Sequence, residues 1–108
     1  MIYWDVEFED EAKKDSKALD INARTQVNKA IRKVSQNPLP KSEGGYGEPL
    51  GNKLGRNLTG LLKIKLKKLG IRVVYRIVRD GEIMKIIVIA ARSDDEVYDI
   101  AEQRNSDR

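Results

Sequence analysis

Apolar residues occupy every second position near the N-terminus. They are Ile2, Trp4, Val6 and Phe8, and acidic residues stand beside them at Asp5, Glu7 and Glu9. A period of two is typical of a strand with one buried face. Residues 2–8 are therefore predicted to form a strand.

The next apolar residues follow a helical period. A charged helix is predicted from Asp10 to about Ala18, with Ala12 and Leu19 as its inward contacts. A second helix places Val27, Ala30, Ile31 and Val34 at positions i, i+3, i+4 and i+7. Asp20 or Asn22 can cap this helix, and Pro38 ends it.

Residues 37–60 interrupt the regular pattern. This segment contains all three prolines and six of the eight glycines, so it is predicted to be a long irregular connection. Lys53 and Arg56 could reach a phosphate from it. A plain connector with solvated charges is an equal alternative.

Three apolar runs follow, at Leu61–Leu66, Ile71–Val78 and Ile83–Ala91. Gly70 marks the first turn between them, and Asp80-Gly81 is a two-residue hairpin signal for the second. The sequence SDDE at 93–96 is a capping box, which predicts a C-terminal helix carrying Val97, Tyr98, Ile100 and Ala101. The order β-α-α-β-β-β-α predicts an α+β fold, with two N-terminal helices packed on a mainly antiparallel four-stranded sheet.

The hairpin turns fix which residues share a face of this sheet. A loop at 67–70 pairs Lys65 with Arg72, and a turn at 80–81 pairs Arg76 with Lys85. One face is then apolar, and it comprises Leu62, Ile64, Leu66, Ile71, Val73, Tyr75, Ile77, Met84, Ile86 and Val88. The opposite face carries Lys63, Lys65, Arg72, Val74, Arg76 and Lys85, with no carboxylate expected beside it.

The distribution of charge strengthens this observation. The net charge is +4, but residues 61–92 hold nine basic and two acidic side chains, whereas residues 1–20 and 93–108 are each net −4. Stacked cations without acidic partners destabilise a strand pair and favour a phosphate-binding surface. The alternative is a solvated face whose lysine and arginine stems cover apolar surface.

Composition excludes several classes of function. The 108-residue chain has no cysteine and no histidine, so it has neither a disulfide framework nor the commonest metal ligand and general base. No stretch is apolar enough to span a membrane, and no signal peptide is evident. We expect a single domain over residues 1–108, without a metal or cofactor, in the cytoplasm.

Metal-free transesterification of RNA is the chemistry that remains. A 2′-hydroxyl attacks its neighbouring phosphate, which requires a base, an acid and cations to stabilise the developing charge. Neighbouring cations favour the neutral amine, so Lys65, between Lys63 and Arg72, is the candidate base. Arg92 and Tyr98 follow the last strand. Alternatively, Arg92 pairs with the acids after it and Tyr98 is a core aromatic residue.

The chain resembles the RelE toxins of bacterial toxin–antitoxin systems, within the RelE/ParE superfamily. The resemblance runs from WDVEFEDEAKK to EVYDIAEQR and is most specific in GLLKIKLKKLGIRVVYRI and VIAARSDDEVY. It implies a fold like that of small microbial ribonucleases. It also implies an mRNA interferase that cuts codons in the ribosomal A site and is neutralised by an antitoxin protein.

The resemblance also implies roles for individual residues. Lys65 would be the general base, Lys63 and Arg72 would stabilise charge, Arg92 would assist the leaving group, and Tyr98 would stack on a base or orient the nucleotide. Lys53, Arg56, Arg76 and Lys85 are expected to contact RNA, the ribosome or the antitoxin. Two departures are Ala90-Ala91, where many relatives have glycine and a basic residue, and a longer loop before Leu61.

Two other functions stay open at this point. A ParE-like toxin of the same fold would poison DNA gyrase without RNA chemistry. A non-catalytic relative would bind RNA in a salt-sensitive manner and leave it intact.

Overall fold

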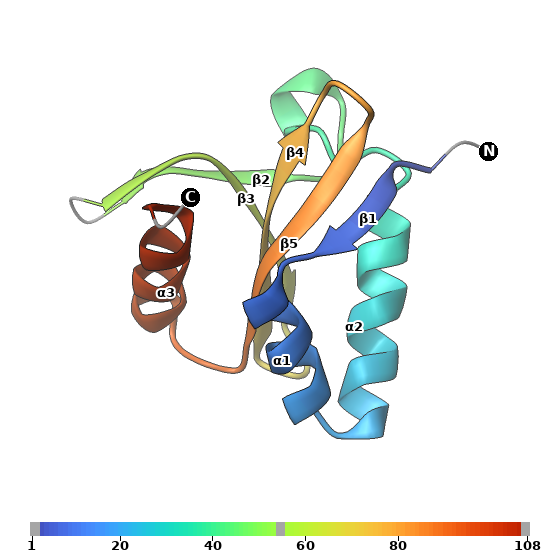
Figure 1. The fold of residues 1–108 in the computed structure, drawn as a ribbon, viewed down its shortest axis with the longest axis vertical. Coiled ribbons are helices and arrows are strands. Elements are labelled where there is room, and N and C mark those ends of the chain that lie inside the picture. Colours follow the sequence, from blue (N-terminus) through green and yellow to red (C-terminus); the bar gives the residue numbers. More distant parts are fainter. Residues whose placement is uncertain (1–2, 54–55, 107–108) are drawn as a thin grey trace.

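A mixed sheet with helices on both of its faces forms the centre of the molecule (Figure 1). The computed structural model describes residues 3–53 and 56–106, and for residues 52, 53, 56, 57 and 106 it describes the backbone only. In chain order the elements are β1 (Asp5–Phe8), α1 (Asp10–Ala18), α2 (Ile21–Val34), the short 3-10 helix η1 (Lys41–Glu43), β2 (Glu48–Lys53), β3 (Arg56–Leu66), β4 (Ile71–Val78), β5 (Ile83–Ala90) and α3 (Asp94–Ser106).

The strand order confirms the predicted fold class. In the described part of the chain the sheet has five strands in the order β1-β5-β4-β3-β2. β1 runs parallel to β5, and all other neighbours are antiparallel. Every predicted element is present in the predicted order, although Ile2 of the first strand lies outside the described residues. The predicted count of four strands is wrong, because β2 adds a fifth.

Strand β2 arises inside the segment predicted to be an irregular connection. It pairs with residues 56–63 of β3, and its register shifts between Pro49 and Gly51. Proline is tolerated in an edge strand or a bulge because no ladder hydrogen bond from its nitrogen is needed there. Leu50 and Leu58 face inward from this hairpin and are buried. The glycines and the proline interrupt the alternation of apolar residues, so this strand was not predicted from the sequence.

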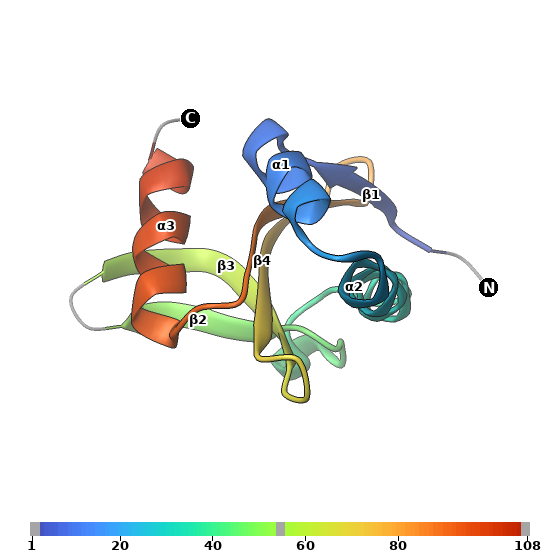
Figure 2. The same cartoon turned by 90° about the horizontal axis from the view of Figure 1, so that it is seen from below.

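The helices cover the two faces unequally. Figures 1 and 2 show α1 and α2 on one side of the sheet and α3 on the other.

Asp20, one of the two predicted caps, accepts a hydrogen bond of 2.8 Å from the Ala23 N–H at the start of α2. Helix α2 then buries Val27, Ile31 and Val34. None of the helices in the described ranges is both long and apolar enough to cross a membrane.

The sheet separates two hydrophobic cores. The larger core lies against α1 and α2, and the smaller one, which includes Leu61, Val74 and Tyr98, lies under α3. Val88 was predicted on the α2 side but belongs to the smaller core. The reason is a bulge in β5: Val74 pairs with Val88 and Tyr75 with Ile86, so one extra residue reverses the alternation.

Gly47 is required by the packing of the larger core. A Cβ atom there would lie 2.5 Å from both Leu62 Cδ2 and the Tyr75 hydroxyl, which donates a 2.8 Å hydrogen bond to the Pro38 carbonyl.

We expect Gly47→Ala to lower the free energy of unfolding by about 2–3 kcal/mol in urea denaturation. Gly44→Ala is the comparison, because its φ is +85° but no atom lies within 4 Å. A loss of about 1 kcal/mol is expected there, and a larger loss at position 44 than at 47 would contradict the packing argument.

Candidate active site

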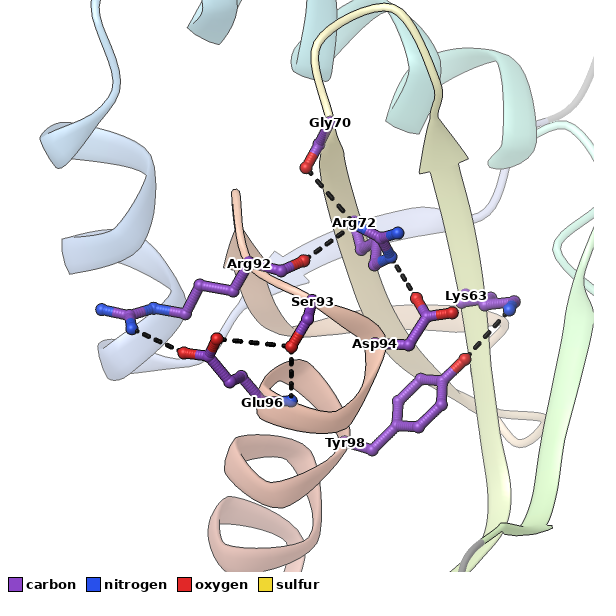
Figure 3. A network of polar contacts seen from close by, with 8 residues as sticks. All are labelled: Lys63, Gly70, Arg72, Arg92, Ser93, Asp94, Glu96 and Tyr98. Carbon is purple, nitrogen blue, oxygen red and sulfur yellow. Dashed lines mark hydrogen bonds and ion pairs between the residues drawn. The ribbon is translucent and has the colours of Figure 1, made fainter.

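Three cations from two adjacent strands form a cluster at one end of the sheet. Lys63 and Lys65 of β3 share a face because they are two residues apart, and Lys65 lies directly opposite Arg72 of β4. This is the predicted register. We call Lys63, Lys65 and Arg72 the cation cluster. Its members Lys63 and Arg72 lie beside the first turn of α3 (Figure 3).

Tyr98 holds one member of the cluster in place. The Lys63 ammonium donates a 3.0 Å hydrogen bond to the Tyr98 hydroxyl. The Tyr98 ring belongs to the smaller core and is only 3% exposed. It is therefore the core aromatic residue that sequence analysis gave as the alternative, and its ring offers no open face on which a base could stack. Its hydroxyl is the part that reaches the site.

The surroundings of Lys63 keep it charged. Burial lowers the pKa of Lys63, but the hydrogen bond from its ammonium to Tyr98 and the nearby Asp94 and Glu48 carboxylates outweigh this effect, so the pKa lies above its ordinary value. Lys63 is thus suited to stabilising negative charge. Lys65 is exposed at the surface, where a substrate can reach its amine.

Arg72 is tied to the start of α3. Its Nη1 donates to the Arg92 carbonyl at 2.7 Å and to the Gly70 carbonyl at 3.4 Å, and its Nε forms an ion pair with Asp94. Its side chain is only 17% exposed. Burial raises the pKa of Asp94, but Arg72, Lys63 and Lys65 outweigh burial and hold that pKa below its usual value. Asp94 therefore stays ionised at neutral pH.

The expectation that no carboxylate stands beside these cations was wrong. The prediction used only the alternation of residues along the strands. Helix α3 folds back over this face and brings Asp94 against Arg72. At the other end of the same face, Glu7 of β1 lies 3.7 Å from Lys85. Carboxylates from distant segments therefore offset part of the charge on the face.

The Arg92 side chain points away from the cation cluster. Its guanidinium donates a 3.1 Å hydrogen bond to Glu96, which lies on the side of α3 away from Tyr98, as Figure 3 shows. Glu96 also accepts a 3.3 Å hydrogen bond from the Ser93 hydroxyl. The Glu96 N–H donates to the same hydroxyl at 3.4 Å, which is the N-cap bond of the predicted capping box. The Arg92 side chain is 59% exposed and can turn. In this conformation only its carbonyl belongs to the site.

Arg76 and Lys85 form a second, separate group. They pair across β4 and β5 as predicted. They line a cavity of about 330 Å³ together with Glu7, Phe8, Glu9 and Asp10. Residues of the smaller core lie between this group and the cation cluster. The side chains of Lys53 and Arg56 lie outside the described part of the structure.

A contact between the first and last helices was missed by sequence analysis. Arg104 of α3 donates a 2.7 Å hydrogen bond to the Asp15 carboxylate of α1, 89 residues away. Arg104 also donates to the Ile87 carbonyl at 2.8 Å, and Asp15 accepts from the Ile89 N–H at 3.0 Å. The pair thus binds the edge of β5 where β1 has ended. No local pattern could reveal this contact.

A larger cavity adjoins the cluster. It has a volume of about 870 Å³ and lies between α1, the end of β5 and α3. Its lining includes Asp15, Arg72, Arg92, Glu96 and Arg104. Within the described residues, no group of three or more histidine, cysteine, aspartate or glutamate side chains is placed to hold a metal ion.

Comparisons with known proteins agree on one group of relatives. Residues 6–96 match the family described as ParE toxin of type II toxin-antitoxin system, parDE. The mRNA interferase toxin RelE of Escherichia coli K12 is 28% identical over 99 residues, which cover 92% of this chain and 94% of that protein.

Solved structures of the Escherichia coli toxin RelE share the fold. A variant in the free state superposes with a TM-score of 0.72 at 26% identity, covering 95% of this chain and 98% of that chain. A variant in complex with an antitoxin RelBc peptide superposes with a TM-score of 0.67 at 26% identity, covering 93% of this chain and 95% of the other.

Proposed function

The chain belongs to the ParE toxin family of type II toxin–antitoxin systems, within which it is a RelE-type toxin, and on this premise we propose that it cleaves messenger RNA in the ribosomal A site. The observation that carries this proposal is the cation cluster, with Lys65 opposite Arg72 and Lys63 fixed by Tyr98. Such a cluster is complementary to a phosphate that gains negative charge during reaction.

The members of the cluster have two different parts in the proposed reaction. The exposed amine of Lys65 removes the proton of the 2′-hydroxyl, whose oxygen attacks the adjacent phosphorus. Lys63 and Arg72 donate hydrogen bonds to the phosphorane oxygens, and they remain charged throughout. The Tyr98 hydroxyl positions Lys63. The reaction requires no metal or cofactor, and the need for a 2′-hydroxyl selects RNA over DNA.

Arg92 joins the reaction only after a rotation of its side chain. The exposed guanidinium leaves Glu96, turns toward the cluster and stabilises the departing 5′-oxygen. That oxygen takes a proton from water as its bond to phosphorus breaks, and a 2′,3′-cyclic phosphate remains. A surface ion pair of this kind contributes less than about 1 kcal/mol, so exchanging it for a phosphate contact is inexpensive.

The proposed partners follow from charge and from the relatives. RelE of Escherichia coli binds an antitoxin peptide, and we propose an antitoxin partner for this chain. Arg76 and Lys85 provide cations for the antitoxin, the message or ribosomal RNA. Lys53 and Arg56 are further candidates for such contacts, and the proposed setting is the cytoplasm.

Alanine variants of Lys65 and Arg92 test the proposal. We expect cells producing Lys65→Ala or Arg92→Ala to grow and to keep translated messages intact, because each variant lacks one group of the reaction. Growth curves and northern blots of a translated message provide the measurement. Variants that arrest growth and cut messages like the parent would contradict the assignment.

The family match favours a second candidate function. A ParE-like toxin would bind DNA gyrase and cause gyrase-linked DNA damage without message cleavage. This alternative does not require the cation cluster, so Lys65→Ala would remain toxic. A third candidate, a non-catalytic relative, would bind RNA in a salt-sensitive manner without cutting it on translating ribosomes.

A further inference from the structure

The Asp94 side chain lies against the cation cluster, although the start of helix α3 does not need it there. Helix α3 is already started by Ser93, whose hydroxyl exchanges hydrogen bonds with Glu96 and whose carbonyl accepts from the Val97 N–H at 3.0 Å. The Asp94 carboxylate turns instead toward the sheet, where it forms an ion pair with Arg72 (Figure 3).

The geometry of this contact resembles phosphate binding. Carboxylate and phosphate oxygens accept hydrogen bonds from guanidinium nitrogens in the same manner. Asp94 also lies close enough to Lys63 and Lys65 for both to favour its ionised form. A phosphate oxygen that reached Arg72 beside both lysines would have to enter the space that the carboxylate now fills.

We propose that Asp94 is an internal mimic of the scissile phosphate, which occupies Arg72 in the free protein and must be displaced when RNA binds. This inference rests on the proposed function and adds a residue that sets the affinity of the site for RNA. The Asp94 side chain is 40% exposed, so it can swing into solvent without unfolding α3. The displaced carboxylate then remains near the cluster and repels the bound phosphate.

Asp94→Asn tests this role because asparagine keeps the shape of the side chain and removes its charge. The probe is a short RNA with one 2′-deoxynucleotide at the cleavage position, which binds but cannot react. We expect the variant to bind this RNA about tenfold more tightly at fixed ionic strength. Fluorescence anisotropy measures the dissociation constant, and thermal unfolding verifies that the variant is folded.

Asp95→Asn is the matched control. It removes the same charge from the same turn of the same helix, so it reports the effect of losing one acidic charge from this turn. We expect it to change the affinity by less than about twofold, because exposed charges are screened by salt. Equal tightening by both variants would overturn the specific role of Asp94.

Unchanged or weaker binding by Asp94→Asn would also overturn the inference. If that variant in addition loses cleavage by about 100-fold or more, Asp94 is the general base instead. Wild-type protein that leaves translated messages intact contradicts the proposed function itself. Wild-type protein that cleaves them while Asp94→Asn binds no more tightly contradicts only the role of Asp94.

Discussion

Replacing Arg72 with alanine is expected to lower the rate of message cleavage by about 10²–10³-fold, the usual effect of removing one donor to a developing oxyanion. Arg72 lies opposite Lys65 and is largely enclosed by Asp94 and the Arg92 carbonyl. Its guanidinium is therefore held in one orientation before the substrate arrives. Cleavage of a message in a reconstituted translation system, followed by primer extension, measures the rate.

The matched control for this variant is Arg79→Ala. Arg79 follows the same strand, but it forms an exposed pair with Glu43 at 2.7 Å and lies outside the cation cluster. Its replacement is expected to leave cleavage within about threefold of the parent. If Arg72→Ala is folded and cleaves as fast as Arg79→Ala, the cluster is not the catalytic site.

Replacing Asp15 with alanine is expected to lower the free energy of unfolding by about 2–3 kcal/mol. The substitution removes the acceptor of the Ile89 N–H. It also removes the carboxylate partner of the Arg104 guanidinium, which is 20% exposed and keeps its hydrogen bond to the Ile87 carbonyl. Both groups then lose hydrogen bonds without gaining full contact with water. Urea denaturation followed by circular dichroism measures the loss.

Two comparisons isolate the contribution of this pair. Glu11→Ala removes an acidic residue from the same helix that is 56% exposed and pairs only weakly with Lys14, so a change within about 0.5 kcal/mol is expected. Exchanging the two charges between positions 15 and 104 should not restore stability. The Ile89 N–H requires an acceptor from α1, and the Ile87 carbonyl requires a donor from α3. Full rescue by the exchange would contradict this arrangement.

Sequence periodicity was sufficient where local rules determine the structure. The turn at 67–70 fixed the pairing of Lys65 with Arg72, and the alternation placed Lys63 on the same face. The capping box located the start of α3. These features depend on neighbours in the chain or on a single hairpin, so they could be derived before the fold was known.

The remaining features depend on contacts between distant segments. The bulge in β5 places Val88 on the other face of the sheet, and no glycine, proline or other residue type in that run predicts a bulge. Asp94 meets Arg72 only because α3 returns across the sheet, and Asp15 meets Arg104 only because α1 and α3 both reach the edge of β5. Arg92 was assigned correctly to the end of the strand, but its rotamer is set by Glu96.

The position of helix α3 affects several residues of the site at once. Four of the five residues assigned to catalysis from the resemblance contact α3 or belong to it, namely Lys63, Arg72, Arg92 and Tyr98. Any movement of α3 therefore changes the position of Tyr98 and the partner of Arg72 together. The Asp15–Arg104 pair anchors the far half of this helix, which links the stability of the fold to the geometry of the site.

Mapping the 5′ ends of cellular messages tests the central proposal most directly. The protein and its Lys65→Ala, Arg72→Ala double variant are each produced briefly in a bacterial host, and message ends are sequenced together with ribosome positions. We predict new ends within codons at the A site for the parent and none above background for the double variant. Growth arrest by the parent with intact messages, and with gyrase-linked breaks in DNA, would contradict the proposal.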